Sequence, residues 1–161
     1  AADWTAGERS LRVNVLSPLR LTTCALPGMV ARGRGCVVDI ASIAALAPTP
    51  GMFFYNASKG ALAAASEGLR AELAPHGVHV VTVYPGPVTS EMETAARARF
   101  AASATAARVP TGTPEVLARL IADAVERRKP RVIYPRVYAL SRLLPGPTRW
   151  LVDRFTPPLR D

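Results

Sequence analysis

Apolar residues in the first half of the chain follow two different patterns. They recur at helical spacing over 8–31 and again over about 53–74, which predicts two long helices. Two unbroken apolar runs, at 36–41 and 78–84, have the length and composition of buried parallel strands. Because each strand is reached through a helix, the pattern predicts right-handed crossovers and a parallel sheet.

The pattern is looser beyond residue 88. Residues 91–107 are rich in alanine and predict a further helix. A Thr-Pro-Glu sequence at 113–115 combines a capping hydroxyl, a proline for the first turn and an acid, which predicts a helix that runs to about Arg128. Residues 131–134 predict a third short strand. The expected fold is α/β, a partial doubly wound parallel sheet with flanking helices.

Composition limits the class of protein. The 161 residues are 49% apolar, which is enough for the core of one domain. No apolar run is long enough to cross a bilayer, and no signal peptide opens the chain. We expect Cys24 and Cys36 to be buried thiols in a cytoplasmic protein. We interpret His76 and His79 as surface or turn residues, and since no Cys/His cluster has ligand spacing, we expect no metal site.

The net charge of +8 is unevenly distributed. Residues 1–126 contain 11 basic and 10 acidic residues, whereas residues 127–161 contain 9 and 2. We expect a domain over 1–135 and a basic, apolar tail over 136–161. The tail has three interpretations: an ordinary solvated surface, which is the simplest, a face that meets a membrane surface or an acyl-phosphate ligand, or a nucleic-acid contact. It contains no recognisable nucleic-acid motif, so we expect no nucleic-acid partner.

Tyr55 and Lys59 form the pair with the clearest chemical meaning. Four residues apart on a helix, they share one face. A phenol with a pKa of about 10 is a poor acid-base catalyst at neutral pH, but an adjacent ammonium lowers that pKa. Ser42, at the end of the first predicted strand, would hydrogen-bond a substrate oxygen. The alternatives are a surface helix pair and a strand-end serine, and the joint occurrence of all three residues favours the catalytic interpretation.

These motifs and their spacing over about 8–92 resemble the classical branch of the short-chain dehydrogenase/reductase family. The matching segments are LRVNVLSPLRLTTCALPGM, GCVVDIASIAA, YNASKGAL and LRAELAPHGVHVVTVYPGPV. The resemblance implies a Rossmann-like fold and an active site formed by Asn14, Ser42, Tyr55 and Lys59. It also implies hydride transfer with NAD or NADP between an alcohol and a ketone or aldehyde.

Each residue then has an implied role. Tyr55 is the general acid-base, and Lys59 lowers its pKa and binds the nicotinamide ribose. Asn14 holds a water molecule in a proton relay, although it is also explained as a polar residue tolerated in a helix. The residues implied to bind the cofactor are Tyr55, Lys59, Pro85, Gly86, Val88 and Ser90.

The sequence also departs from the family pattern. Asp39 stands where the family usually has Asn, and Ala41 where it usually has Ser. The glycine-rich G-x-x-x-G-x-G turn that binds the cofactor pyrophosphate is absent, as are three strand–helix units of roughly 30 residues each. We therefore expect the C-terminal part of a dehydrogenase. The alternative to an active oxidoreductase is a non-catalytic fragment that cannot hold its cofactor alone.

The resemblance extends to partners. It implies a homo-oligomer formed through the helices at 8–31 and 53–74, where small residues would allow close approach. These small residues are Ala61, Ala64, Ala65 and Gly68. The alanine-rich segment at 91–107 lies where a substrate lid is expected, and together with the apolar tail it favours a hydrophobic substrate.

Overall fold

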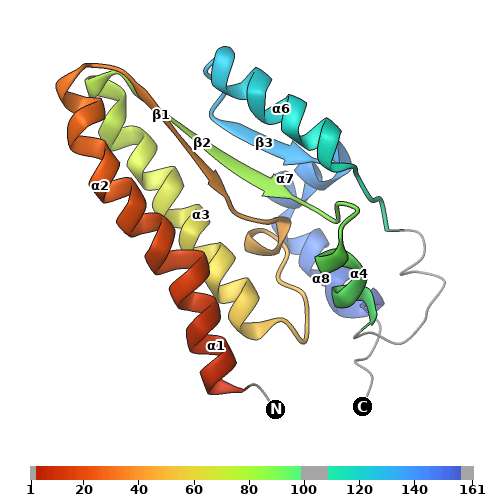
Figure 1. Cartoon of the computed structure of the whole chain (residues 1–161). Coiled ribbons are helices and arrows are strands. Elements are labelled where there is room, and N and C mark those ends of the chain that lie inside the picture. Colours follow the sequence, from red (N-terminus) through yellow and green to blue (C-terminus); the bar gives the residue numbers. More distant parts are fainter. Residues whose placement is uncertain (1–2, 99–108, 157–161) are drawn as a thin grey trace.

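The computed structural model describes residues 3–98 and 109–156. Its centre is a parallel sheet with the strand order β1-β2-β3 (Figure 1). These strands are β1 (Gly35–Ile40), β2 (Val78–Pro85) and β3 (Arg131–Tyr134). The parallel sheet and all three predicted strands are therefore confirmed, to within one residue at each end.

The main helices are α1 (Trp4–Leu11), α2 (Ser17–Ala31), α3 (Phe53–Leu73), α4 (Glu91–Ala98), α6 (Pro114–Glu126), α7 (Leu140–Leu143) and α8 (Pro145–Phe155). Short 3-10 turns are η2 (Ile43–Ala45), η3 (Ala74–His76) and η4 (Arg136–Ala139). The helix predicted over 91–107 is confirmed as far as Ala98, and its remainder lies outside the described residues.

The helix predicted over 8–31 is instead α1 and α2 joined by a π turn, η1 (Arg12–Leu16). It begins earlier than predicted, because the Asp3 side chain accepts a hydrogen bond from the Thr5 amide at 3.0 Å and caps the first turn. Pro18 has no N–H to donate to the Asn14 carbonyl, so regular α-helical bonding cannot continue through this point. The result is a wider turn that contains Asn14.

The core lies on both faces of β2. Val78 and Val80 face α2 and α3, whereas Val81 and Val83 face α6. These valines are at most 2% exposed, as expected for a central strand covered on both faces. Figure 1 shows this three-layer arrangement, with α2 and α3 to the left of the sheet and α6 to its right.

β1 forms one edge of the sheet. Among the described residues it pairs only with β2. Ile40, its last residue, is 43% exposed. A strand with one unpaired edge leaves a row of backbone donors and acceptors without a strand partner.

Two sequence predictions about single residues are wrong. Cys24 is exposed on the outer side of α2, and only Cys36 is half-buried. His79 is buried in β2, where its Nε2 atom lies 3.0 Å from the Lys129 carbonyl oxygen, so it is a core residue and not a surface residue. His76 is exposed, as predicted. No helix in the described ranges has the length and hydropathy needed to span a bilayer.

Candidate active site

The four predicted catalytic residues come from β1 and from the helices packed beside it. Ser42 follows the carboxyl end of β1, Tyr55 and Lys59 lie in the first turns of α3, and Asn14 lies in η1. η1 packs against α3. These elements bring the four residues to neighbouring segments of the chain.

The Lys59 side chain is anchored to the end of β1. Its Nζ atom donates a hydrogen bond to the Ile40 carbonyl oxygen at 2.8 Å. Burial lowers the pKa of Lys59. An ammonium has three N–H donors, and within the described residues Lys59 has no carboxylate partner. Two of its donors therefore remain for other groups at this end of the sheet.

Tyr55 is half-buried, and its hydroxyl makes no hydrogen bond to any described residue. Tyr55 and Lys59 therefore share a helix face without a direct bond between their side chains. The Tyr55 backbone is held more firmly, because its carbonyl accepts a hydrogen bond from the Ser58 hydroxyl at 2.8 Å. Ser58 is fully buried, which fixes the first turn of α3 against η1.

Asn14 bridges the two helical segments. Its Nδ2 group donates to the hydroxyls of Ser10 and Ser58, each at 3.2 Å. Through Ser58 it is connected to the backbone of Tyr55. The sequence analysis did not single out Ser10 or Ser58, although both lie on the helix faces that carry the predicted residues. This bridge gives Asn14 a structural role, and the predicted water relay to Lys59 stays a prediction.

Ser42 has two local hydrogen bonds. Its hydroxyl accepts from the Ala44 amide at 3.1 Å, which caps the turn η2, and it donates to the Pro85 carbonyl at 3.5 Å. The side chain is buried and connects the ends of β1 and β2. Ser42 is therefore a capping residue that also lies at the carboxyl edge of the sheet.

The loop after β2 is held against the segment before α6. Val88 forms a parallel bridge with Gly112, and the Thr89 amide donates to the Gly112 carbonyl at 3.1 Å. Ser90 caps the first turn of α4, because its hydroxyl accepts a hydrogen bond from the Glu93 amide at 3.1 Å. The predicted cofactor residues of this loop thus have fixed backbone positions.

Gly86 in this loop is required for packing. Its amide donates to the Tyr134 carbonyl at 2.7 Å, and a Cβ atom at Gly86 would lie 2.6 Å from the Tyr138 ring. A side chain here would displace η4 from the end of the sheet. Pro85, one residue earlier, is the last residue of β2 and accepts the Ser42 hydrogen bond.

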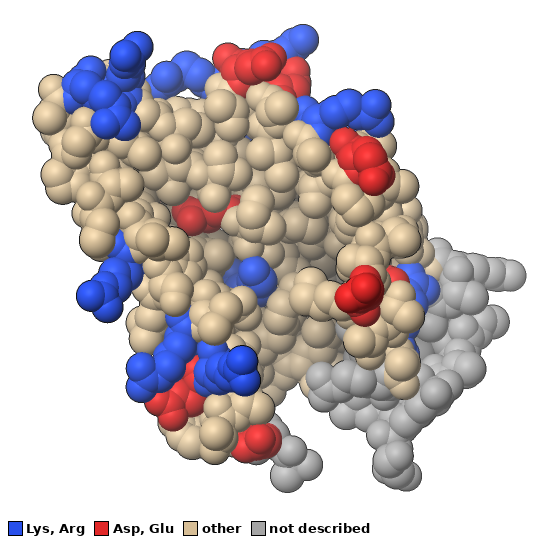
Figure 2. Space-filling model, viewed as in Figure 1, with Lys and Arg blue, Asp and Glu red and all other residues tan. Residues whose placement is uncertain are grey.

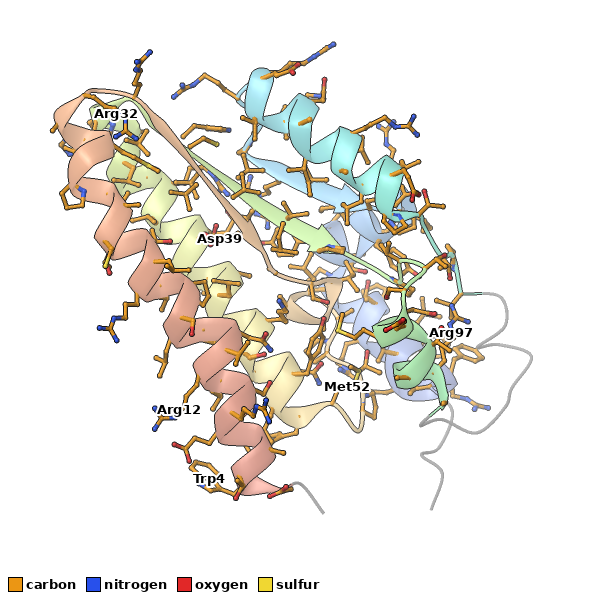
Figure 3. All side chains as sticks on the ribbon, viewed as in Figure 1. Trp4, Arg12, Arg32, Asp39, Met52 and Arg97 are labelled. Atoms are coloured by element: carbon orange, nitrogen blue, oxygen red, sulfur yellow. The ribbon has the colours of Figure 1, made fainter. Side chains whose placement is uncertain are left out.

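Helix α8 contacts the loop that joins Ser42 to α3. Arg149 of α8 donates to the Pro48 carbonyl at 2.5 Å, in the loop between Ser42 and α3, and pairs with Asp153. Figure 3 labels Met52 in the same loop. Sequence reasoning missed this contact because 101 positions separate Arg149 from Pro48.

A polar network that the sequence analysis did not identify lies between α3 and the sheet. Glu67 accepts hydrogen bonds from Arg70 at 2.6 Å, from Tyr84 at 2.9 Å and from the Nε and Nη2 atoms of Arg131. Burial alone would raise the pKa of Glu67, but these donors outweigh it and lower the pKa to about 2. Burial and the Glu67 charge raise the pKa of Tyr84 to about 12.

Asp39 (labelled in Figure 3), one of the family departures, is connected to this network through Ser66. It is 8% exposed, and burial raises its pKa although a hydrogen bond with Ser66 opposes the shift. Ser66 in turn lies 2.8 Å from the Thr82 hydroxyl, to which Arg70 also donates. The network therefore joins β1, β2 and α3 beneath the candidate site.

Comparison with known proteins decides the family. The family model described as short chain dehydrogenase matches residues 2–100, more than half of the chain. The chain belongs to the short-chain dehydrogenase family. It is similar to the Escherichia coli K12 protein described as "Uncharacterized oxidoreductase YbbO", with 34% identity over 150 residues, covering 86% of this chain and 55% of that protein.

Other members of the family match shorter segments or the fold. Human "Dehydrogenase/reductase SDR family member 4" is 42% identical over 79 residues, which cover 49% of this chain and 28% of that protein. A Burkholderia cenocepacia short-chain dehydrogenase solved with NADP has a TM-score of 0.76 and 28% identity, covering 96% of this chain and 62% of that one. The chain thus spans about half the length of the curated relative that it matches over most of its sequence.

Proposed function

We propose that the whole short-chain dehydrogenase containing this chain interconverts an alcohol with a ketone or aldehyde, using NAD or NADP. The observation that carries the proposal is the Lys59 ammonium, anchored on the Ile40 carbonyl at the end of β1 and on the same helix as Tyr55. The E. coli relative is described as an oxidoreductase, and the B. cenocepacia structure contains NADP, which supports the same chemistry.

Three side chains would each have a separate role at the reacting oxygen. The Tyr55 hydroxyl would donate a proton to a carbonyl oxygen in reduction and accept one from an alcohol in oxidation. The Lys59 charge would favour the phenolate. Ser42 would hydrogen-bond the same oxygen, which requires its hydroxyl to leave the 3.5 Å bond to Pro85, a long and weak contact.

The donors at this edge fit the nicotinamide half of the cofactor. Lys59 has two N–H donors for ribose hydroxyls, and the backbone of the loop around Val88 and Ser90 is fixed by its contacts with Gly112 and Glu93. When bound, NAD or NADP supplies or accepts the hydride. The residues that determine specificity for NAD or NADP lie outside the matched motifs, so the proposal includes both cofactors.

A second candidate applies to the 161 residues in isolation. The sequence has no G-x-x-x-G-x-G turn for the pyrophosphate, and among the described residues β1 has no strand beyond it. We infer that the isolated chain holds its cofactor weakly, even where the whole protein is an active oxidoreductase.

We also propose self-association through the outer face of α2 and α3. Ala61, Ala64 and Gly68 are exposed on α3 and would allow another helix to approach closely, whereas Ala65 is half-buried. Sedimentation velocity is expected to show a dimer or larger species that Ala64→Arg weakens. A monodisperse monomer at high micromolar concentration would exclude this interface.

The activity is tested by oxidation and reduction assays on the full-length parent. A panel of apolar ketones, aldehydes and secondary alcohols is offered with each of NADH, NADPH, NAD and NADP, and reduced nicotinamide is followed by absorbance. We expect turnover of at least one apolar substrate with one cofactor pair. Cofactor binding without turnover of any carbonyl or alcohol would count against catalysis.

A further inference from the structure

Helices α7 and α8 expose six large apolar side chains. Leu143 is 73% exposed and Trp150 is 62% exposed, although a residue of either type is usually buried. The Trp150 and Phe155 rings pack edge to face with centroids 6.1 Å apart. We call this surface the α7–α8 face, and its exposed apolar members are Leu140, Leu143, Leu144, Trp150, Leu151 and Phe155.

The structure divides the basic residues of 127–161 into groups with different surroundings. Arg127 and Lys129 pair with Asp123 near the start of β3, and Figure 2 shows basic and acidic side chains intermixed at that end of the molecule. The remaining group lies on and beside the α7–α8 face. Its described charged residues are Arg136, Arg142, Arg149 and Arg154 against Asp153, so that four positive charges and one negative charge give +3.

Two of these four arginines are already engaged. Arg149 pairs with Asp153, and Arg142 lies 3.6 Å from Glu67. Arg136 and Arg154 are exposed, and the Arg154 guanidinium lies 5.7 Å from the centre of the Phe155 ring. A cation beside an exposed aromatic ring is the combination that interfacial helices present to lipid headgroups.

We propose that the α7–α8 face rests on a membrane surface that contains anionic phospholipids. The apolar side chains would enter the headgroup boundary, and Arg136 and Arg154 would meet lipid phosphates and carboxylates. A two-fold contact with a second copy would instead bring the exposed Arg136 and Arg154 of both copies to one interface, which like-charge repulsion disfavours. No helix of the described chain can cross the bilayer, so this is contact with one leaflet.

The position of the α7–α8 face places the proposed membrane contact near the candidate active site. α8 is tied to the Pro48 loop, between Ser42 and Tyr55 in sequence. Figure 1 shows α8 at the same end of the molecule as the start of α3. A membrane under α8 would therefore lie beside the candidate active site.

Vesicle flotation tests the proposal, because bound protein rises with the lipid whereas aggregated protein sinks. We expect the full-length protein to float with vesicles of phosphatidylcholine and phosphatidylserine, and to be released by raised salt. Flotation that is equal on pure phosphatidylcholine, or absent from both, overturns the proposal.

Matched arginine variants test whether membrane binding depends on the α7–α8 face or on the net charge of the protein. One basic residue near an anionic surface changes binding about fivefold, so Arg136→Gln with Arg154→Gln should weaken it about 25-fold. The control pair, Arg20→Gln with Arg119→Gln, removes the same charge from exposed positions on α2 and α6. Equal loss in both pairs would show that overall charge, not the α7–α8 face, controls binding.

The two tryptophans provide a second readout that does not depend on affinity. Trp4 and Trp150 are 67% and 62% exposed, so they start from similar solvent contact. Trp4→Phe leaves Trp150 as the reporter, whose emission should shift to the blue on anionic vesicles. Trp150→Phe leaves Trp4, whose emission should stay unchanged. A Trp150 reporter that does not shift while the protein floats would overturn the orientation we propose.

Discussion

The Lys59 ammonium donates to the Ile40 main-chain carbonyl at 2.8 Å, which ties α3 to the last residue of β1. The bond fixes a positive charge at the edge of the sheet where Ser42 begins the next loop. The position of Lys59 therefore depends on a backbone atom, which no side-chain substitution on β1 removes.

Tyr55→Phe in the full-length parent should reduce turnover by orders of magnitude with little loss of stability. The substitution keeps the ring and removes only the hydroxyl, which no described residue bonds. Steady-state kinetics and thermal unfolding are measured on the same sample. Tyr134→Phe is the matched control, since its hydroxyl accepts a bond from the Thr113 amide away from the candidate catalytic residues. Near-parental turnover in Tyr55→Phe would remove Tyr55 from the mechanism.

Lys59→Gln should move the pH profile of alcohol oxidation to higher pH. In the proposed mechanism the Lys59 charge assists proton removal from the alcohol, so its loss should make oxidation depend on a higher hydroxide concentration. The kcat profile of the parent and the variant is compared across neutral and alkaline pH. A lower kcat with an unchanged profile would mean that Lys59 only positions α3 through Ile40.

Glu67→Gln should destabilise the fold at neutral pH and make unfolding less sensitive to acid. The folded pKa of Glu67 is about 2 against an ordinary value of 4.5, so its stabilisation is present above pH 4.5 and is lost as pH falls toward 2. The full shift corresponds to about 3 kcal/mol, but Glu67 is 22% exposed and we expect a loss of about 1–2 kcal/mol after solvent screening.

The Glu67 effect is measured by urea unfolding at neutral pH and near pH 3. Glu72→Gln on the same helix is the control, because Glu72 is exposed. The difference between Glu67→Gln and the parent should shrink at the lower pH. A constant difference would assign the loss to packing and not to the carboxylate charge.

The isolated 161 residues should bind NADH and NADPH weakly or not at all, and should tend to aggregate. The unpaired edge of β1 offers backbone groups to another chain, and the sequence contains no glycine-rich turn for the pyrophosphate. Calorimetric titration with both cofactors and light scattering check the two parts. Micromolar binding by a soluble, isolated chain would favour a stand-alone enzyme.

Local patterns predicted the elements well, because strands such as 78–84 are buried on both faces and consist mainly of apolar residues. The same patterns could not show contacts between distant segments. Glu67 and Arg131 are 64 positions apart, and Arg149 and Pro48 are 101 apart. Nor did they show that Ser58, one residue before Lys59, is the buried partner of Asn14. Motif spacing indicates which residue types recur, whereas these contacts depend on how the crossovers bring helices together.

The π turn at Arg12–Leu16 changes how α1 is rotated about the helix axis relative to α2. One extra residue in a turn rotates everything before it by about 100° relative to a continuous α-helix. With this rotation Gly7 faces α3, where a Cβ atom would lie 2.3 Å from the Phe54 ring, while Met29 packs on the sheet. Deleting one residue between Arg12 and Leu16 would therefore turn α1 away from Phe54 and leave α2 in place.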